Sequence, residues 1–210
     1  MSAYLEAIRS GAPGALTVED AAGLSRIVTE RRPRRCLEIG MAHGVASLAI
    51  LEATGGTLVS VDPNQTAEFG NIGSANVVAA GWADRHELVE EPDYLALPAL
   101  LRRGERFDFV FVDGWHSFDH VVLDLFYADK LLETGGVIGF DDCQMPATRR
   151  ALRFLQTHKP YQELPVLPPR YEGATAARRL LRRALGWSSH DRWFQKLRDA
   201  PVPWDFYRHF

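Results

Sequence analysis

Three carboxylates directly follow short apolar runs of the kind that form buried strands. Asp113 follows the run 107–112, and Asp141 and Asp142 follow the run 136–140. If these runs lie side by side in a parallel sheet, the acids meet at one edge, where a cation or a proton must offset their repulsion. Mg²⁺ accepts two or three carboxylates and leaves positions for water and substrate oxygens. We therefore expect Asp113, Asp141 and Asp142 to bind a divalent metal; alternatively, an aspartate caps the next helix and Asp113 binds a ligand amide.

The loop after Asp113 carries further groups that could take part in a reaction. His116 lies three residues further along the chain, and an imidazole can act as a general base near neutral pH. We expect Asp113 and His116 to be catalytic. Trp115 would wall off a planar or sugar substrate, or the adenine of a cofactor. His120, one helical turn further on, is expected to pack on the sheet; alternatively, it is a partner of His116.

A glycine-containing loop follows the first apolar run and reads EIGMAHG over residues 38–44. Glycines let the backbone turn tightly and approach a ligand, with the N–H groups of the next helix pointing at it. A dinucleotide site would read G-x-G-x-x-G, but here Glu38 replaces the first glycine and would repel a pyrophosphate. The carboxylate suits a cation instead; the alternative is a tight turn that binds nothing.

Acidic residues also close the next two apolar runs. Asp62 ends the run 57–61, about twenty residues past the glycine loop, where it can accept hydrogen bonds from ribose hydroxyls. Its alternative role is that of a turn residue before Pro63. Asp93 and Tyr94 follow the run 86–90 and would flank an adenine, although Asp93 would serve equally well as the N-cap of the next helix.

Apolar runs alternate with helical stretches through most of the chain. The expected strands are 35–39, 57–61, 86–90, 107–112 and 136–140, and the expected helices are 45–53, 71–80, 94–102, 118–132 and 146–158. Uninterrupted apolar strands between helices indicate a parallel sheet covered on both faces. We therefore expect an α/β, Rossmann-like, doubly wound and mostly parallel sheet with helices on both faces.

The same patterns divide the chain into three parts. Residues 1–33 form an N-terminal helical cap, with Thr17 as the N-cap of a helix over 16–31. Residues 34–168 form the ligand-binding domain, in which a turn at 133–136 separates a helix from a strand. Residues 169–210 form a basic, aromatic extension that packs on the domain and contains an amphipathic helix at 176–185. Residues 161–167 could add one strand, but the tail lacks a clear pair of closing antiparallel strands.

Charge is distributed unevenly along the 210 residues. Residues 1–146 contain 11 Lys and Arg against 22 Asp and Glu, whereas 147–210 contain 13 against 5. Because the acidic part holds the candidate site, we expect no nucleic-acid partner. The apolar runs are far shorter than the ~20 residues of a membrane span, and the start lacks a secretory pattern, so we expect no membrane insertion. Two cysteines in apolar segments predict a reducing, cytoplasmic location.

These motifs together resemble those of class I S-adenosylmethionine-dependent methyltransferases over residues 34–160. The resemblance rests on the pattern E-x-G-x-x-x-G from Glu38, on Asp62 and on the aspartates that follow the later strands. The stretches FVDGWHSFDH (111–120) and FYADKLLETGGVIGFDD (126–142) are similar to the bacterial subfamily that includes macrolide and aminocoumarin sugar O-methyltransferases. Catechol O-methyltransferase is a more distant likeness.

The resemblance implies roles for individual residues. Those implied to contact S-adenosylmethionine are Glu38, Gly40, Met41 and Gly44 at its methionine end, Asp62 at its ribose, Asp93 and Tyr94 at its adenine, and Asp113 and Trp115. In metal-dependent members Mg²⁺ is held by the acids after the fourth and fifth strands, which correspond to Asp113, Asp141 and Asp142. The catechol enzymes carry a catalytic lysine at the position of His116. The small hydroxyl residue often found two positions after Gly44 is Ala46 here, with Ser47 one step later.

The resulting hypothesis is a Mg²⁺-assisted O-methyltransferase acting on a small-molecule hydroxyl of a sugar, a natural product or a catechol-like compound. Three alternatives stay open at this point: a metal-independent N-, C- or O-methyltransferase, a non-catalytic cofactor-binding module, and an NAD-dependent oxidoreductase. The sequence leaves open which acceptor is used, whether the metal is required and whether the chain forms a homo-oligomer.

Overall fold

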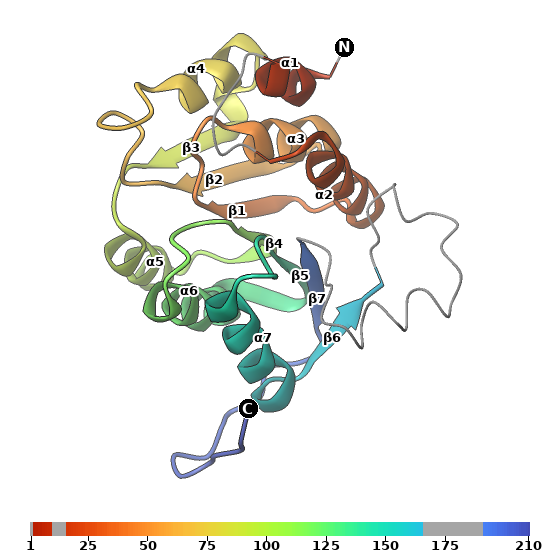
Figure 1. Cartoon of the computed structure of the whole chain (residues 1–210), viewed down its shortest axis with the longest axis vertical. Coiled ribbons are helices and arrows are strands. Elements are labelled where there is room, and N and C mark those ends of the chain that lie inside the picture. Colours follow the sequence, from red (N-terminus) through yellow and green to blue (C-terminus); the bar gives the residue numbers. More distant parts are fainter. Residues whose placement is uncertain (1, 10–15, 166–190) are drawn as a thin grey trace.

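Seven strands of the described chain form one mixed sheet. The computed structural model describes residues 2–9, 16–165 and 191–210. The strands are β1 (Arg35–Ile39), β2 (Thr57–Val61), β3 (His86–Val89), β4 (Phe107–Val112), β5 (Leu132–Phe140), β6 (Tyr161–Leu164) and β7 (Arg192–Lys196). Their order is β3-β2-β1-β4-β5-β7-β6 (Figure 1), with parallel pairing from β3 to β5 and antiparallel pairing of β7 with both neighbours. The predicted doubly wound α/β fold is confirmed.

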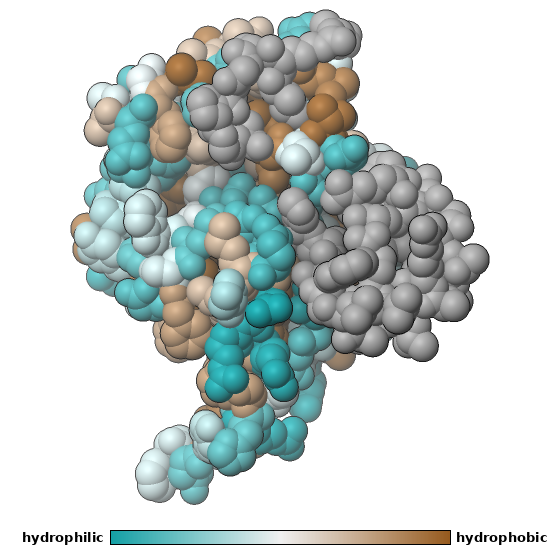
Figure 2. Space-filling model, in the orientation of Figure 1, coloured by the Kyte–Doolittle hydropathy of each residue, from teal (hydrophilic) through white to brown (hydrophobic). Residues whose placement is uncertain are grey.

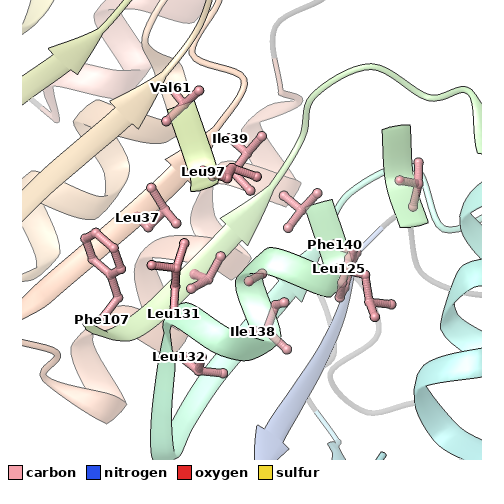
Figure 3. Packing of buried hydrophobic residues seen from close by; sticks show 14 of the residues in the cluster. Leu37, Ile39, Val61, Leu97, Phe107, Leu125, Leu131, Leu132, Ile138 and Phe140 are labelled. Atoms are coloured by element: carbon pink, nitrogen blue, oxygen red, sulfur yellow. The ribbon is translucent and has the colours of Figure 1, made fainter. Parts of the chain in front are cut away.

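Helices cover both faces of the sheet. One face carries α1 (Ala3–Arg9), α2 (Val18–Arg31), α3 (Val45–Ala53) and α4 (Ile72–Ala79), and the other carries α5 (Asp93–Arg102), α6 (Phe118–Leu131) and α7 (Pro146–His158); a 3₁₀ turn at Ala83–Arg85 precedes β3 (Figure 1). Successive side chains of a strand point to opposite faces, so Cys36 joins the core beneath α1–α4 and Leu37 the core beneath α5–α7. Figure 3 shows side chains of the second core, among them Ile39 of β1 and Leu97 of α5.

Helix boundaries follow the local signals in the sequence. The Thr17 hydroxyl accepts a hydrogen bond from the Asp20 N–H at 3.2 Å and caps α2, as predicted. The helix ends at Arg31, after which Arg32 adopts a left-handed conformation (φ 50°) and Pro33 prevents continuation. The five helices predicted between strands lie within one residue of their expected ends.

Two local predictions are wrong. The turn expected at 133–136 lies within β5, which begins at Leu132, pairs with Phe107, and shifts register before Phe109. The sheet also closes with an antiparallel pair, because β7 inserts between β5 and β6. The sequence does not indicate β7 because a charged residue, Lys196, occupies a buried position of this strand. Its ammonium group is satisfied there by donating to the carbonyls of Asp129 and Leu132 at 2.7 and 2.9 Å.

The C-terminal segment packs partly against α7. The rings of Phe206 and Phe210 lie 5.6 and 5.3 Å from the His158 ring, whereas Trp204 is 98% exposed. Figure 2 shows mainly hydrophilic residues over α7, consistent with its exposed arginines. The helix expected at 176–185 lies outside the described residues. Among the helices that are described, none combines the length and apolar character needed to cross a membrane.

Gly139 makes room for the largest buried side chain of the added strand. It pairs with Trp193, whose ring stacks on Phe111 at 5.6 Å, and a Cβ at position 139 would overlap that ring. We predict that Gly139→Ala lowers the free energy of unfolding by about 1–3 kcal/mol. The melting temperature would fall by about 2–4 °C for each kcal/mol. Thermal denaturation followed by circular dichroism measures this.

Gly55→Ala is the matched control, because a Cβ there would meet no atom within 4 Å. Equal melting temperatures for the two variants would contradict the packing argument.

Candidate cofactor and metal site

The carboxyl ends of the parallel strands form one edge that carries the predicted residues. At four places the first residue after a strand donates its N–H to the last carbonyl of the neighbouring strand. These bonds run from Gly40 to Val61, Asp62 to Val89, Asp113 to Ile39 and Asp141 to Val112, at 2.8–3.1 Å. They hold the glycine loop and the three aspartates in a row. Ligands of doubly wound sheets bind at this edge, where the strand order reverses between β1 and β4.

Gly40 brings the loop after β1 against the loop after β4. Its φ is 89°, and a Cβ would overlap the backbone carbonyl of Asp113. Glycine alone tolerates both conditions without strain. Gly44 then occupies the N-cap of α3, so the first N–H groups of this helix, which have no partner within the helix, face the same edge.

Asp62 holds the glycine loop in place. Its Oδ2 accepts hydrogen bonds from the N–H groups of Met41 and Ala42 at 2.9 and 2.7 Å, and its Oδ1 accepts one from the Asn64 N–H at 2.8 Å. The side chain is only 4% exposed. Asp62 therefore lies at the end of β2, as the sequence predicted. Its hydrogen bonds hold the glycine loop in position, which the sequence did not indicate. Its contact with a ribose stays a prediction.

Glu38 is a fully buried carboxylate with one oxygen unoccupied. Its Oε2 accepts hydrogen bonds from the hydroxyls of Ser47 and Ser60, both at 2.5 Å, whereas Oε1 has no hydrogen-bond partner in the described part of the chain. Burial raises the pKa of Glu38 to about 7, and the negative charge of Asp62 adds to the rise, while the two serines oppose it. A buried carboxylate oxygen without a donor is costly, so Glu38 is suited to a ligand that brings a positively charged donor.

Asp113, His116 and Asp142 form a group that could hold a metal ion. Each offers one ligand atom, and these atoms lie within 4.8 Å of one another. His116 Nε2 is 2.9 Å from Asp142 Oδ2. The pKa of Asp113 is raised well above its usual range, first by burial and then by the charges of Asp141 and Asp142. A cation would relieve that repulsion, and two carboxylates with an imidazole are a suitable donor set for a divalent ion.

Asp141 faces a second set of acids. Its Oδ1 accepts a hydrogen bond from the Asp142 N–H at 2.6 Å, and its side chain is hydrogen-bonded to Asp191, just before β7. Burial raises the pKa of Asp141 and Asp191, and the charge of Asp20 from α2 adds to both shifts. Two carboxylates can hydrogen-bond to each other only by sharing a proton. The sequence did not indicate Asp20 or Asp191, which lie on elements far from the motifs.

Asp93 and Tyr94 begin α5, with Pro92 rather than Asp93 at the N-cap. Asp93 Oδ2 is 2.6 Å from His120 Nδ1, and the Tyr94 ring lies edge-on to the His120 ring at 6.3 Å. His120 thus contacts Asp93 on another helix, a pairing that the sequence did not predict. Trp115, in the loop after β4, is 68% exposed. Asp93, Tyr94 and His120 thus form an acidic and aromatic group at the starts of α5 and α6.

Asp124 of α6 is a buried acid beneath that loop. Its side chain is fully buried, and neither oxygen has a hydrogen-bond donor in the described part of the chain. Burial raises its pKa to about 8, and the neighbouring Asp93 adds to the rise. A cavity of about 10 Å³ lies between Asp124, Gly114, His116 and Asp141. A hollow of about 350 Å³ at the opposite edge, lined by Arg31, Pro33, Asp108 and residues 133–137, includes none of the predicted site residues.

Comparison with known proteins gives consistent matches. A family profile described as a methyltransferase domain matches residues 37–143. A protein of Mycobacterium tuberculosis named catechol O-methyltransferase is 27% identical over 170 residues, which cover 69% of this chain and 76% of that protein. The structure of an O-methyltransferase from Bacillus cereus in complex with SAH has a TM-score of 0.69 at 19% identity, covering 78% of this chain and 83% of that one.

A second solved structure has the same fold. The O-methyltransferase TomG from Streptomyces achromogenes, in complex with SAM, has a TM-score of 0.67 at 24% identity, covering 78% of this chain and 82% of that one. At these identities the two structures establish the shared fold.

Replacing Asp124 with asparagine should stabilise the protein at alkaline pH. Because the pKa of Asp124 is raised in the folded state, to about 8, its favourable contribution is present at low pH and is lost as the pH rises through that value. An amide cannot ionise, so Asp124→Asn should melt at a higher temperature than the wild type at about pH 9, with the gain lost at about pH 5. Thermal denaturation of the ligand-free protein at both pH values measures this.

The exposed Asp84 provides the control. We expect Asp84→Asn to change the melting temperature equally at the two pH values; a pH-independent effect of Asp124→Asn would refute the assignment.

Proposed function

The chain belongs to the methyltransferase-domain family of S-adenosylmethionine-dependent enzymes, and on that premise we propose that it transfers the cofactor's methyl group to a hydroxyl oxygen of a small molecule with the help of Mg²⁺. Family membership removes the oxidoreductase and the non-catalytic alternatives. The observation that carries the proposal is the row of acids Glu38, Asp62 and Asp113 along one edge of the sheet. Such a row favours a cationic ligand.

S-adenosylmethionine matches this edge in charge, and its methionine end, ribose and adenine match the order of the candidate residues along it. Its methionine end carries an ammonium group and a sulfonium, and the partnerless oxygen of Glu38 suits the ammonium. Gly40, Met41 and Gly44 would border the methionine end, and Asp62 the ribose. Asp93 and Tyr94 would border the adenine, with Trp115 beside it.

The acids after β4 and β5 support a metal site. We propose that Asp113 and Asp142 bind Mg²⁺. Asp141 adds a third negative charge and positions Asp142, because Asp141 Oδ1 accepts a hydrogen bond from the Asp142 N–H. Bound there, Mg²⁺ would lower the pKa of the acceptor hydroxyl and fix its position. The mutual repulsion that raises the pKa of Asp113 is the physical reason for a cation at this place.

The chain's own residues would then align the groups and move the proton. The hydroxyl oxygen attacks the methyl carbon, the carbon–sulfur bond breaks, and its electron pair stays on sulfur, which gives S-adenosylhomocysteine. If Nε2–H of His116 donates to Asp142, Nδ1 is the nitrogen that can accept the hydroxyl proton. Because the methyl group is already activated, alignment of oxygen, carbon and sulfur is the main requirement.

A metal-independent O-methyltransferase is the second candidate. It is favoured by the contact between His116 and Asp142, which forms an oriented base without an ion. In that mechanism the carboxylates would bind the substrate directly. The acceptor in both cases is a hydroxylated small molecule, such as a catechol, a sugar or another natural product, as the name of the mycobacterial relative suggests. The buried free thiols of Cys36 and Cys143 suit the cytoplasm, where we place the enzyme.

Cofactor binding tests the role of the acid row. We predict that the wild type binds S-adenosylmethionine and not NAD, and that Asp62→Asn weakens that binding by about tenfold or more, because hydrogen bonds to a charged group are lost from the loop. Isothermal titration calorimetry measures both. Asp108→Asn is the matched control, since Asp108 also accepts from two backbone N–H groups, those of Arg34 and Arg35, but at the opposite edge. Equal losses in the two variants would contradict the proposal.

Metal binding separates the two candidate mechanisms. We predict that the complex with S-adenosylhomocysteine binds one Mg²⁺ per chain and that Asp113→Asn weakens this binding about tenfold or more, because a charged ligand is lost. Calorimetric titration with MgCl₂ measures it, and Asp119→Asn, an exposed site at the start of α6, is the control. A wild type that binds no Mg²⁺ would rule out metal assistance and favour the metal-independent mechanism.

A further inference from the structure

A chain of hydrogen bonds crosses three strands and ends on Glu38. His86 Nε2 of β3 lies 2.9 Å from the Ser60 hydroxyl of β2, and Ser60 donates to Glu38 Oε2 of β1 at 2.5 Å. Ser47 of α3 donates to the same oxygen, also at 2.5 Å. Both serines and Glu38 are fully buried. The methyltransferase assignment by itself gives Ser47, Ser60 and His86 no role.

Counting the available protons shows which group donates in each hydrogen bond of this series. A serine hydroxyl has one proton, and Ser60 gives it to Glu38, so Ser60 must accept from His86. His86 Nε2 therefore carries a proton, and burial, which lowers the pKa of His86 to about 4, keeps the imidazole neutral near pH 7. Every donor along the chain points toward Glu38 Oε2.

This arrangement makes the two oxygens of Glu38 unequal. Oε2 has two donors, whereas Oε1, equally buried, has none in the described part of the chain. Two fixed donors on one oxygen also prevent the carboxylate from turning to exchange its oxygens. The negative charge of Asp62 raises the pKa of Glu38, and the charge of Glu38 raises that of Asp113. Because these acids lie near one another, the surroundings of Oε1 favour a cationic donor.

We propose that Ser47, Ser60 and His86 are positioning residues that hold Glu38 Oε2 so that Oε1 is presented to the α-ammonium group of the cofactor. The inference rests on the proposed function, since it requires S-adenosylmethionine or its product at this edge. It deepens that function by assigning recognition of the amino group to a buried network rather than to Glu38 alone. The network would let the site discriminate ligands that carry the amine from ligands that lack it.

Two ligands that differ by one amino group test the proposal. Calorimetry compares S-adenosylhomocysteine with its analogue that lacks the α-amino group, for the wild type and Ser60→Ala. We expect Ser60→Ala to weaken the binding of S-adenosylhomocysteine about tenfold, because Glu38 loses a hydrogen-bond donor and its carboxylate can turn. The affinity for the analogue should change by less than about twofold. Ser60→Thr, which keeps the hydroxyl, should restore the wild-type preference.

Ser47→Ala, on a helix rather than a central strand, provides a second test if Ser60→Ala does not fold. Thr54→Val is the control, because the buried Thr54 hydroxyl donates to the Pro33 carbonyl at the opposite edge; it should leave both affinities unchanged. Equal weakening of the two ligands by the serine variants, or no weakening, would overturn the positioning role while leaving the cofactor assignment intact. A wild type that binds neither ligand would overturn the proposed function and this inference together.

Discussion

Negative charge held out of water at one edge of the sheet is the constraint on which the rest of this structure depends. Glu38 is completely buried, and burial raises the pKa of Glu38, Asp113, Asp141 and Asp191. Burying so many acids without compensation is unfavourable. Protons can satisfy part of the requirement in the free protein. The proposed cationic ligands would satisfy it when bound, which would link stability, pH and binding at the same edge.

Backbone geometry determines where those charges lie. The hydrogen bonds that join each strand end to its neighbour place the acids in a row, and Gly40 allows two loops to touch. Asp62 then anchors the glycine loop through two backbone N–H groups. The loops that would enclose the cofactor are thus held by the same carboxylates that give the site its charge. A change at Asp62 therefore affects both loop shape and electrostatics.

The two faces of the sheet support the site in different ways. Beneath α1–α4, Glu38 and Ser60 pair in register on β1 and β2, and Ser47 reaches them from α3. Beneath α5–α7, Asp124 is buried below the loop that carries His116. Polar groups within otherwise apolar layers lower stability unless they are satisfied. Their presence on both sides of one loop cluster is consistent with a function at that edge.

The sequence by itself determined the parallel strands, the helices between them and the acids after each strand, because apolar runs and turn residues act locally. It could not indicate β7, whose pairing partners are distant and whose buried Lys196 resembles a surface residue. Nor could it show that Asp20, Asp141 and Asp191 gather, or that Ser60 and His86 point at Glu38. Only the tertiary structure decided these contacts, because proton sharing and hydrogen bonding depend on distances of a few ångströms between residues that are far apart in the chain.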